Sequence, residues 1–187
     1  KDHHVVVLRK DPYAEEPAAV IALEVCTGFE ELDDLVERFR VSRCVIDGLP
    51  ETHATRAFAK RHPGQIYMCF FSESQRGAAV WDRKAKTVLV NRTEALDESR
   101  AMVREHRVAV SRSMALVQEF ARHMSCDAKV LDEDPDTGAK KYRYVRTGEN
   151  HFSMAFTYAC LAVSKGVGLP MSAEQAEAFW SRIFPLG

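Results

Sequence analysis

Segment 42–53 constrains the fold more than any other part of the sequence. It contains a short apolar run, 44–46, that is typical of a buried strand, and Asp47 follows this run directly. Gly48 permits a tight turn and Pro50 suits the first position of a helix, so we predict a strand, a turn and a helix in that order. Ligands of open α/β sheets bind beyond the carboxyl ends of the strands, where Asp47 would lie. The alternative is that Asp47 only caps the turn or the helix.

The length and composition fit a single globular domain. The chain has 187 residues, of which 46% are hydrophobic and 28% are charged. No apolar run approaches the roughly 20 residues that a membrane-spanning helix needs, so we expect no membrane partner. The net charge of −1 means that any contact with DNA must come from a local basic patch. The five cysteines include no Cys-x-x-Cys pair, which favours a reducing cytosolic setting over a zinc site.

The hydrophobic pattern predicts a mixed order of strands and helices in one domain, 1–187. In the first part we expect a hairpin of strands 5–8 and 18–25, a helix 28–39, the strand 44–47, a helix 50–62 and a strand 65–71. In the second part we expect a small hairpin 78–82 and 87–90, helices 92–106 and 113–125, a strand 140–145, a helix 151–164 and a terminal helix 172–183. Thr27 and Glu30 form the pattern of a capping box before the first helix. The crossover lengths favour a parallel core.

Three segments resemble the nuclease domain of tailed-phage terminase large subunits. They are 43–54 around Asp47, the Asn-Arg-Thr of 91–93, and the Asn-His-Phe of 150–152, which opens a helix that continues past Tyr158. The likeness runs from about residue 3 to residue 164 and preserves the order of elements. It implies an α/β fold of the RNase H-like kind, a mixed sheet flanked by helices, here with an extra β-hairpin.

The resemblance also implies an activity. Such a domain is a metal-dependent endonuclease that cuts double-stranded DNA during phage genome packaging in the host cytoplasm. Two divalent cations, Mg²⁺ or Mn²⁺, would activate the attacking water and stabilise the leaving 3′ oxygen, and Asp47 would be the ligand between them. The implied partners are the terminase ATPase domain, the small terminase subunit and the portal protein. No Walker A pattern occurs in this sequence, so the ATPase motor is not expected within it.

Two departures from the family pattern bear on catalysis. The family's first acid lies on an opening strand directly before the position of Lys1, so we expect that this strand is missing. The third acid falls at Asn150, with Glu149 and His151 beside it. The resemblance therefore implies the catalytic set Asp47, Glu149, Asn150 and His151, with the first three as metal ligands. Without the resemblance, Asn150 is simply the N-cap of a helix.

Other polar residues have both a functional and a structural interpretation. Glu51 either binds metal or stabilises the first turn of its helix, and His3, His4 and His53 are interpreted as structural rather than as ligands. Four basic residues on the late strand, Lys140, Lys141, Arg143 and Arg146, either contact DNA phosphates or form an ordinary solvated hairpin with acidic neighbours.

The alternatives to a packaging nuclease are of two kinds. The first is a catalytically disarmed RNase H-like module for DNA binding or assembly. The second is another RNase H-like nuclease, such as a junction resolvase or a transposase. The terminal helix 172–183 either packs on the domain or docks to a partner.

Overall fold

The computed structural model describes residues 2–11, 15–133 and 138–164. The strands are β1 (His3–Arg9), β2 (Ala18–Cys26), β3 (Cys44–Asp47), β4 (Ile66–Phe71), β5 (Val80–Asp82), β6 (Thr87–Val90), β7 (Val108–Val110), β8 (Asp127–Glu133) and β9 (Lys140–Arg146). The helices are α1 (Phe29–Arg38), α2 (Thr52–Arg61), α3 (Arg92–Arg104), α4 (Val117–Met124) and α5 (His151–Ser164). The mixed α/β class predicted from the sequence is confirmed.

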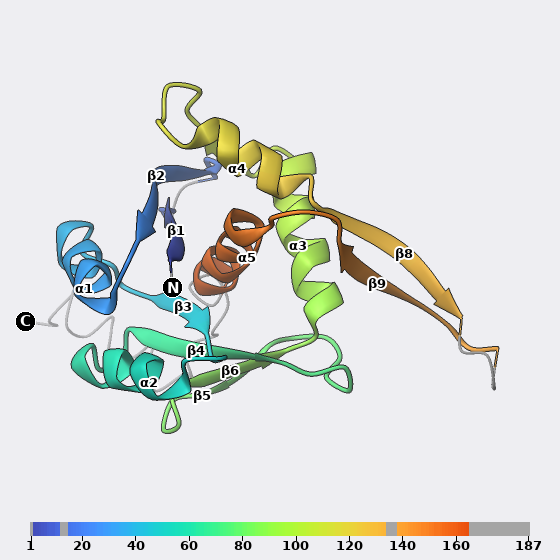
Figure 1. The fold of residues 1–187 in the computed structure, drawn as a ribbon, viewed down its shortest axis with the longest axis horizontal. Helices are drawn as coiled ribbons and strands as arrows, with labels where there is room; N and C mark the ends of the chain where they lie inside the picture. Colours follow the sequence, from blue (N-terminus) through green and yellow to red (C-terminus); the bar gives the residue numbers. More distant parts are fainter. Residues whose placement is uncertain (1, 12–14, 134–137, 165–187) are drawn as a thin grey trace, which may run out of the picture.

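The strands form three separate hydrogen-bonded groups (Figure 1). One group has the order β1-β2-β7, with β1 and β2 antiparallel as predicted. A second has the order β3-β4-β6-β5, in which β3, β4 and β6 are parallel. The third is the hairpin of β8 and β9. The predicted parallel core is therefore confirmed in the second group.

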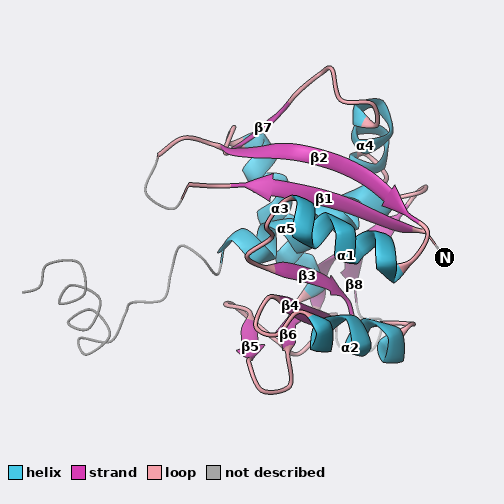
Figure 2. Ribbon diagram, turned by 90° about the vertical axis from the view of Figure 1, so that its left-hand side faces the viewer, coloured by secondary structure: helices cyan, strands magenta, loops and turns pink. Residues whose placement is uncertain are grey.

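Helices cover both faces of the two larger groups. On one face, α1 and α2 pack against β2, β3 and β4 through apolar side chains that include Phe58 and Ile66. On the other face, Phe152 and Phe156 of α5 pack with α3, α4, β1 and β2. Farther along the same helix, Tyr158 packs against β3, β4 and β6. Helix α5 thus contacts both β1 and β3 and ties the two sheets together, and Figure 2 shows these sheets as an upper and a lower set of strands.

Several local predictions need correction. Gly28, not Thr27, is the N-cap of α1, and glycine has no side chain that could cap the helix. Thr27 instead donates its backbone N–H and its hydroxyl to Glu31, at 2.9 and 2.7 Å, so the predicted box with Glu30 is wrong by one residue. Helix α2 begins at Thr52 rather than at Pro50, because Glu51 is its N-cap, and the Leu49–Pro50 peptide before it is cis.

The remaining differences concern short elements. Helix α4 covers only 117–124 of the predicted 113–125, and α3 ends two residues before the predicted 106. The three-residue β7 and the strand β8 were not among the predicted elements. The predicted terminal helix 172–183 lies outside the described residues. Among the residues that the structure describes, no helix is both long and apolar enough to cross a membrane. All five cysteines are free thiols.

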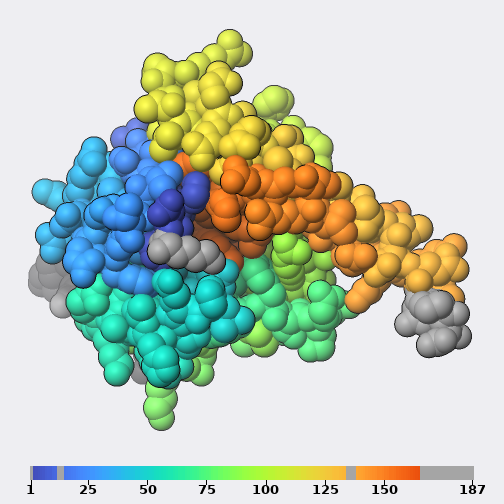
Figure 3. Space-filling model, viewed as in Figure 1, coloured from blue at the N-terminus to red at the C-terminus, as the bar shows by residue number. Residues whose placement is uncertain are grey.

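The β8–β9 hairpin projects from the body as an arm (Figure 3). Asp97 of α3 anchors its base, because it accepts hydrogen bonds from Lys129 Nζ at 2.8 Å and from the Tyr144 hydroxyl at 2.9 Å. Asp97 looks like an ordinary exposed helix residue in the sequence, so its role depends on the tertiary structure.

Candidate functional site

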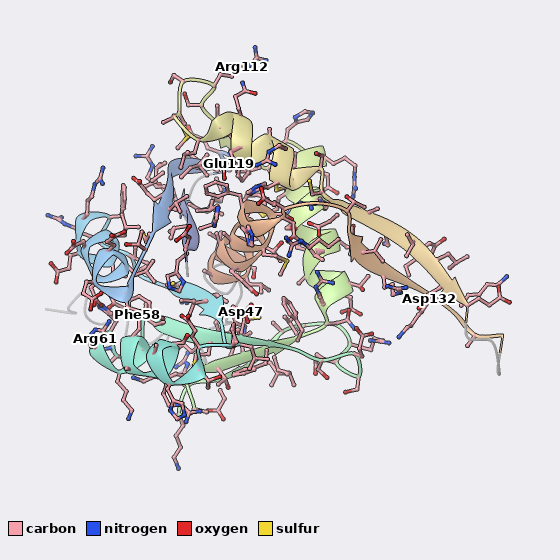
Figure 4. All side chains as sticks on the ribbon, in the orientation of Figure 1. Asp47, Phe58, Arg61, Arg112, Glu119 and Asp132 are labelled. Atoms are coloured by element: carbon pink, nitrogen blue, oxygen red, sulfur yellow. The ribbon has the colours of Figure 1, made fainter. Side chains whose placement is uncertain are left out.

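Asp47 ends β3 at a tight turn, as its sequence predicts. Its Oδ1 accepts a hydrogen bond from the backbone N–H of Leu49 at 3.0 Å. A Cβ atom on Gly48 would lie 2.5 Å from the ring of Phe70, so only glycine fits there. The Thr52 hydroxyl closes the turn by donating to the Gly48 carbonyl at 2.7 Å. Asp47 therefore does cap its turn, and its exposed carboxylate also stands at the carboxyl end of a parallel strand (Figure 4).

A cavity of about 620 Å³ lies between β1 and β3, and we call it the slot. Asp47 and Glu51 line it together with His3, His4 and His151. His3 Nε2 lies 3.9 Å from Glu51 Oε2, which places the start of β1 beside the end of β3. The slot therefore brings together two of the four predicted catalytic residues, Asp47 and His151, along with Glu51.

Tyr158 lines the slot beside Asp47 and was not predicted as a site residue. The residue is 8% exposed, and its hydroxyl oxygen is buried. Burial raises the pKa of Tyr158, and the nearby Asp47 carboxylate raises it further. The phenol is therefore a neutral hydrogen-bond donor that lies in the slot beside the Asp47 carboxylate. In the sequence, Tyr158 lies at helical spacing within an apolar helix, a pattern that indicates only a core residue.

The Asn150 side chain is part of a buried hydrogen-bond network around Asp127. Its Nδ2 donates to Asp127 Oδ1 at 2.6 Å, and Arg100 Nη2 donates to Asp127 Oδ2 at 2.9 Å. Ser153 also donates to Asp127 Oδ2, at 2.5 Å. The Asp127 side chain is completely buried, so it depends on these donors. Asn150 lines no part of the slot, and its backbone carbonyl accepts the first α5 bond, from Met154 N–H, as an N-cap does.

Glu149 and His151 flank Asn150 but point to different partners. Glu149 is exposed and pairs with Arg122 at 3.2 Å, which lowers the pKa of Glu149. His151 stacks on His4 with ring centroids 4.8 Å apart, at the edge of the slot. Of the predicted metal ligands, therefore, only Asp47 lines the slot, while Glu149 and Asn150 bond to side chains outside it.

The four predicted DNA-binding residues all have exposed side chains on β9. Three pair with carboxylates: Lys140 with Glu133 at 3.4 Å, Lys141 with Glu73 at 3.4 Å, and Arg143 with Asp132 at 2.9 Å. The fourth, Arg146, donates to the Gly148 carbonyl at 2.7 Å. Exposed ion pairs contribute at most about 1 kcal/mol each, so phosphate groups can compete for these cations. His53 is exposed on α2 and does not line the slot.

A second polar cluster was missed by the sequence reasoning. His4, Glu119 and His123 offer ligand atoms that all lie within 4.8 Å of one another. Glu119 and His123 have helical i, i+4 spacing, but nothing in the sequence links them to His4 on a distant strand. His4 Nε2 and His123 Nε2 lie 3.5 and 3.8 Å from Glu119 Oε1, at the rim of a smaller cavity of about 460 Å³ that Glu149 and His151 also line.

The remaining ring nitrogens of this cluster argue against a bound metal. A metal-bound histidine normally donates its other ring N–H to an acceptor. His123 Nδ1 instead accepts the backbone N–H of Phe152 at 3.2 Å, and His4 Nδ1 is buried without a hydrogen-bond partner in the described structure. The bond from Phe152 places the proton of His123 on Nε2, which faces Glu119 and also lies 3.3 Å from Arg122 Nη2. His123 serves as a cap for the first turn of α5.

Acidification is expected to destabilise the protein through these two histidines. Burial lowers the pKa of His4 and of His123, although Glu119 opposes the shift. Between the lowered pKa values and about 6.5, these histidines are protonated in the unfolded chain but not in the folded protein. The free energy of unfolding therefore falls as the pH drops below about 6.5, and it stops falling below the pKa values of the folded state. Urea unfolding at pH 7.5 and 5.5 measures this, with an expected loss of about 1 kcal/mol.

The His4→Leu variant tests the assignment, because it removes one of the two groups. We expect a smaller pH-dependent loss in His4→Leu and an unchanged loss in His53→Leu, whose side chain is exposed on α2. An equal pH dependence in the parent and in His4→Leu would contradict the role given to His4.

Comparisons with protein-family models, with curated proteins and with solved structures found no match for this chain. Its function is therefore inferred from its own residues and their arrangement. The fold establishes a mixed α/β protein with an acidic residue at the end of a parallel strand.

Proposed function

We propose that this chain is an RNase H-like nuclease domain of the terminase large subunit kind, a metal-dependent endonuclease acting on double-stranded DNA. The observation that carries the proposal is Asp47, an exposed carboxylate at the carboxyl end of a parallel strand and at the rim of a cavity. This is the edge at which α/β proteins bind ligands.

The strand arrangement supports the RNase H-like assignment. An antiparallel pair, β1 and β2, is followed by the parallel strands β3 and β4, with helices on both faces. The late helix α5, which the resemblance places at the active site, packs against both β1 and β3. His151, in its first turn, lines the same cavity as Asp47.

Some of the residues at the rim of the slot are suitable ligands for divalent cations. Mg²⁺ and Mn²⁺ prefer hard oxygen ligands, which Asp47 and Glu51 offer. When bound, two such ions supply an activated water and stabilise the leaving oxygen. To bind the same ions, Asn150 would have to break its hydrogen bond to Asp127, and Glu149 would have to break its ion pair with Arg122. The chain's own contribution is thus the positioning of Asp47 by its turn, while His151 lines the same cavity and stacks on His4.

The β8–β9 arm provides the proposed DNA contact. Its exposed cations Lys140, Lys141, Arg143 and Arg146 would neutralise phosphates and position a duplex without reading its sequence. Within a packaging machine in the host cytoplasm, the ATPase domain, the small terminase subunit and the portal protein would be the partners of this domain.

We expect Asp47→Asn to reduce Mn²⁺-dependent cleavage of supercoiled plasmid by at least about 100-fold, because the loss of a metal ligand costs more than the 10- to 100-fold typical of its supporting residues. Asparagine keeps the oxygen that accepts the Leu49 N–H, so the turn is preserved. Conversion to nicked and linear plasmid, followed on gels over a Mn²⁺ titration, measures the effect.

Asp34→Asn is the matched control, because Asp34 is exposed on α1 and lies away from the slot. It should cleave as the parent does. Equal cleavage by the parent and by Asp47→Asn would refute the role of Asp47. A preference for branched substrates over plasmid would favour a resolvase instead.

The second candidate is a catalytically inactive RNase H-like module that binds DNA. The hydrogen bond of Asn150 to Asp127 favours this candidate. An amide at this position carries no charge for a metal, and its nitrogen is bonded to Asp127. A folded parent chain that binds duplex DNA in gel shifts but does not cleave it at any Mn²⁺ concentration would support this candidate over the nuclease.

A further inference from the structure

We propose that a second basic surface, separate from the β8–β9 arm, binds the phosphate backbone of double-stranded DNA. It consists of Arg56 and Lys60 on α2 and of Arg83 and Lys84 in the turn between β5 and β6, and we call it the basic patch. The inference rests on the proposed function for the identity of its ligand, but it requires no cleavage.

The cations of the basic patch are exposed and have no acidic partners. None of the four forms an ion pair within the part of the chain that the structure describes. Helix α2 contains no acidic residue, and neither does segment 83–86. On the arm, by contrast, Lys140, Lys141 and Arg143 each pair with a carboxylate. The positive charge of the basic patch is therefore available to an anionic ligand.

Lys86 holds the two halves of the basic patch together. Its Nζ donates a hydrogen bond at 2.7 Å to the carbonyl of Ala59, the residue before Lys60. The two turn cations belong to the same tight turn as Lys86, so they lie beside the C-terminal end of α2. Arg56 lies one helical turn before Lys60 on the exposed side of the helix. Residues far apart in the sequence thus form one charged surface.

The turn between β5 and β6 is ordered by its own hydrogen bonds. The Asp82 Oδ1 atom accepts the backbone N–H groups of Lys84 and Ala85, both at 2.8 Å. The Asp82 carboxylate therefore serves the main chain of the turn rather than a cation. A turn that is already ordered loses less conformational freedom when its side chains bind a ligand.

The spacing and the polarity of the basic patch favour DNA as its ligand. Four residues of helix separate Arg56 and Lys60 by about 6 Å along α2. A duplex carries one negative charge per about 1.7 Å of its axis, so several phosphates lie within that length. A membrane surface would favour apolar side chains that insert beside the cations. Phe58, the one large apolar residue of α2, is buried instead.

The basic patch and the arm lie on different sides of Asp47. Helix α2 follows the Asp47 turn directly, and its Thr52 hydroxyl donates to the Gly48 carbonyl at 2.7 Å. In Figure 4, Asp47 lies between Arg61 of α2 on one side and Asp132 of the arm on the other. A duplex that contacts both basic surfaces would therefore pass Asp47.

The test measures the fluorescence anisotropy of a fluorescein-labelled DNA duplex of mixed sequence with the full chain, in EDTA and over a series of KCl concentrations. Lys60→Gln should reduce the slope of log affinity against log salt by about 0.9, the value of one lost phosphate contact. Replacing all four cations by glutamine should reduce this slope by about 3 to 4 and the affinity by at least about tenfold.

Arg112→Gln is the matched control, because Arg112 is exposed in the loop before α4, far from α2 in Figure 4. Its slope should equal that of the parent. Absence of duplex binding by the parent, or an unchanged slope in the fourfold variant, would overturn the proposal. So would an equal loss in Arg112→Gln, or binding to phosphatidylserine vesicles in place of the duplex.

The outcome is separable from that of the proposed nuclease activity. Asp47→Asn should bind the duplex as the parent does, because EDTA removes the divalent cations and no step of cleavage is measured. Salt-dependent binding through the basic patch in a chain that never cleaves would support the patch and refute the nuclease. Cleavage by a chain whose fourfold variant binds with the parent's slope would refute the patch alone.

Discussion

Replacing Arg100 by methionine is expected to lower the free energy of unfolding by about 3–5 kcal/mol, the largest effect we expect from a single substitution in this chain. Arg100 Nη2 is 2.9 Å from Asp127 Oδ2, and the Asp127 side chain has no solvent exposure. Methionine keeps most of the stem of the arginine side chain but leaves a buried carboxylate without its cation. Urea unfolding at pH 7 measures the change.

Arg104→Met is the matched control for this prediction. Arg104 lies on the same helix, one turn further, and its side chain is exposed. Its replacement should change the unfolding free energy by no more than about 0.5 kcal/mol. A similar small change for Arg100→Met would show that Asp127 does not depend on this ion pair.

The second large effect is expected for Asn150→Asp, which should lose about 3 kcal/mol of stability at pH 7. The Asn150 amide donates to Asp127 Oδ1 at 2.6 Å, and a carboxylate there would oppose the negative charge of Asp127. Two carboxylates that share a site raise one pKa, so the folded protein would take up a proton at a higher pH than the unfolded chain. The loss is therefore present at pH 7 and shrinks as the pH falls through the raised pKa.

An exchange of the two side chains provides the control for Asn150→Asp. The double variant Asp127→Asn with Asn150→Asp restores one amide and one carboxylate, so it should recover part of the lost stability. Asn150→Ala removes the donor without adding a charge, and its loss should not vary between pH 7 and pH 5. A pH-independent loss in Asn150→Asp would contradict the assigned pairing.

The Asn150→Asp variant also tests the proposed nuclease activity. Asn150→Asp restores the acid that the family resemblance implies at this position. Cleavage of plasmid by Asn150→Asp but not by the parent would mean that the scaffold is that of a nuclease with a disarmed site. If neither chain cleaves and both bind DNA, the binding module is the better explanation.

Local order could be predicted wherever a short segment determines its own structure. The Asp47 turn depends on a β-branched run, one glycine and near-neighbour hydrogen bonds, all of which lie within 44–52. The parallel core followed from the lengths of the crossovers between apolar runs. The capping of α1 was off by one residue because Glu30 and Glu31 are both one turn from Thr27, and side-chain geometry decides between them.

The sequence by itself determined the mixed α/β class, the parallel strands and the position of Asp47, because periodicity and turn chemistry are local properties. Only the tertiary structure decided which side chains meet. It joined Asn150 to Asp127 and Arg100, placed His4 beside Glu119 and His123, and left the slot open between β1 and β3. These contacts link residues far apart in the chain, and their energies depend on burial, which no local pattern records.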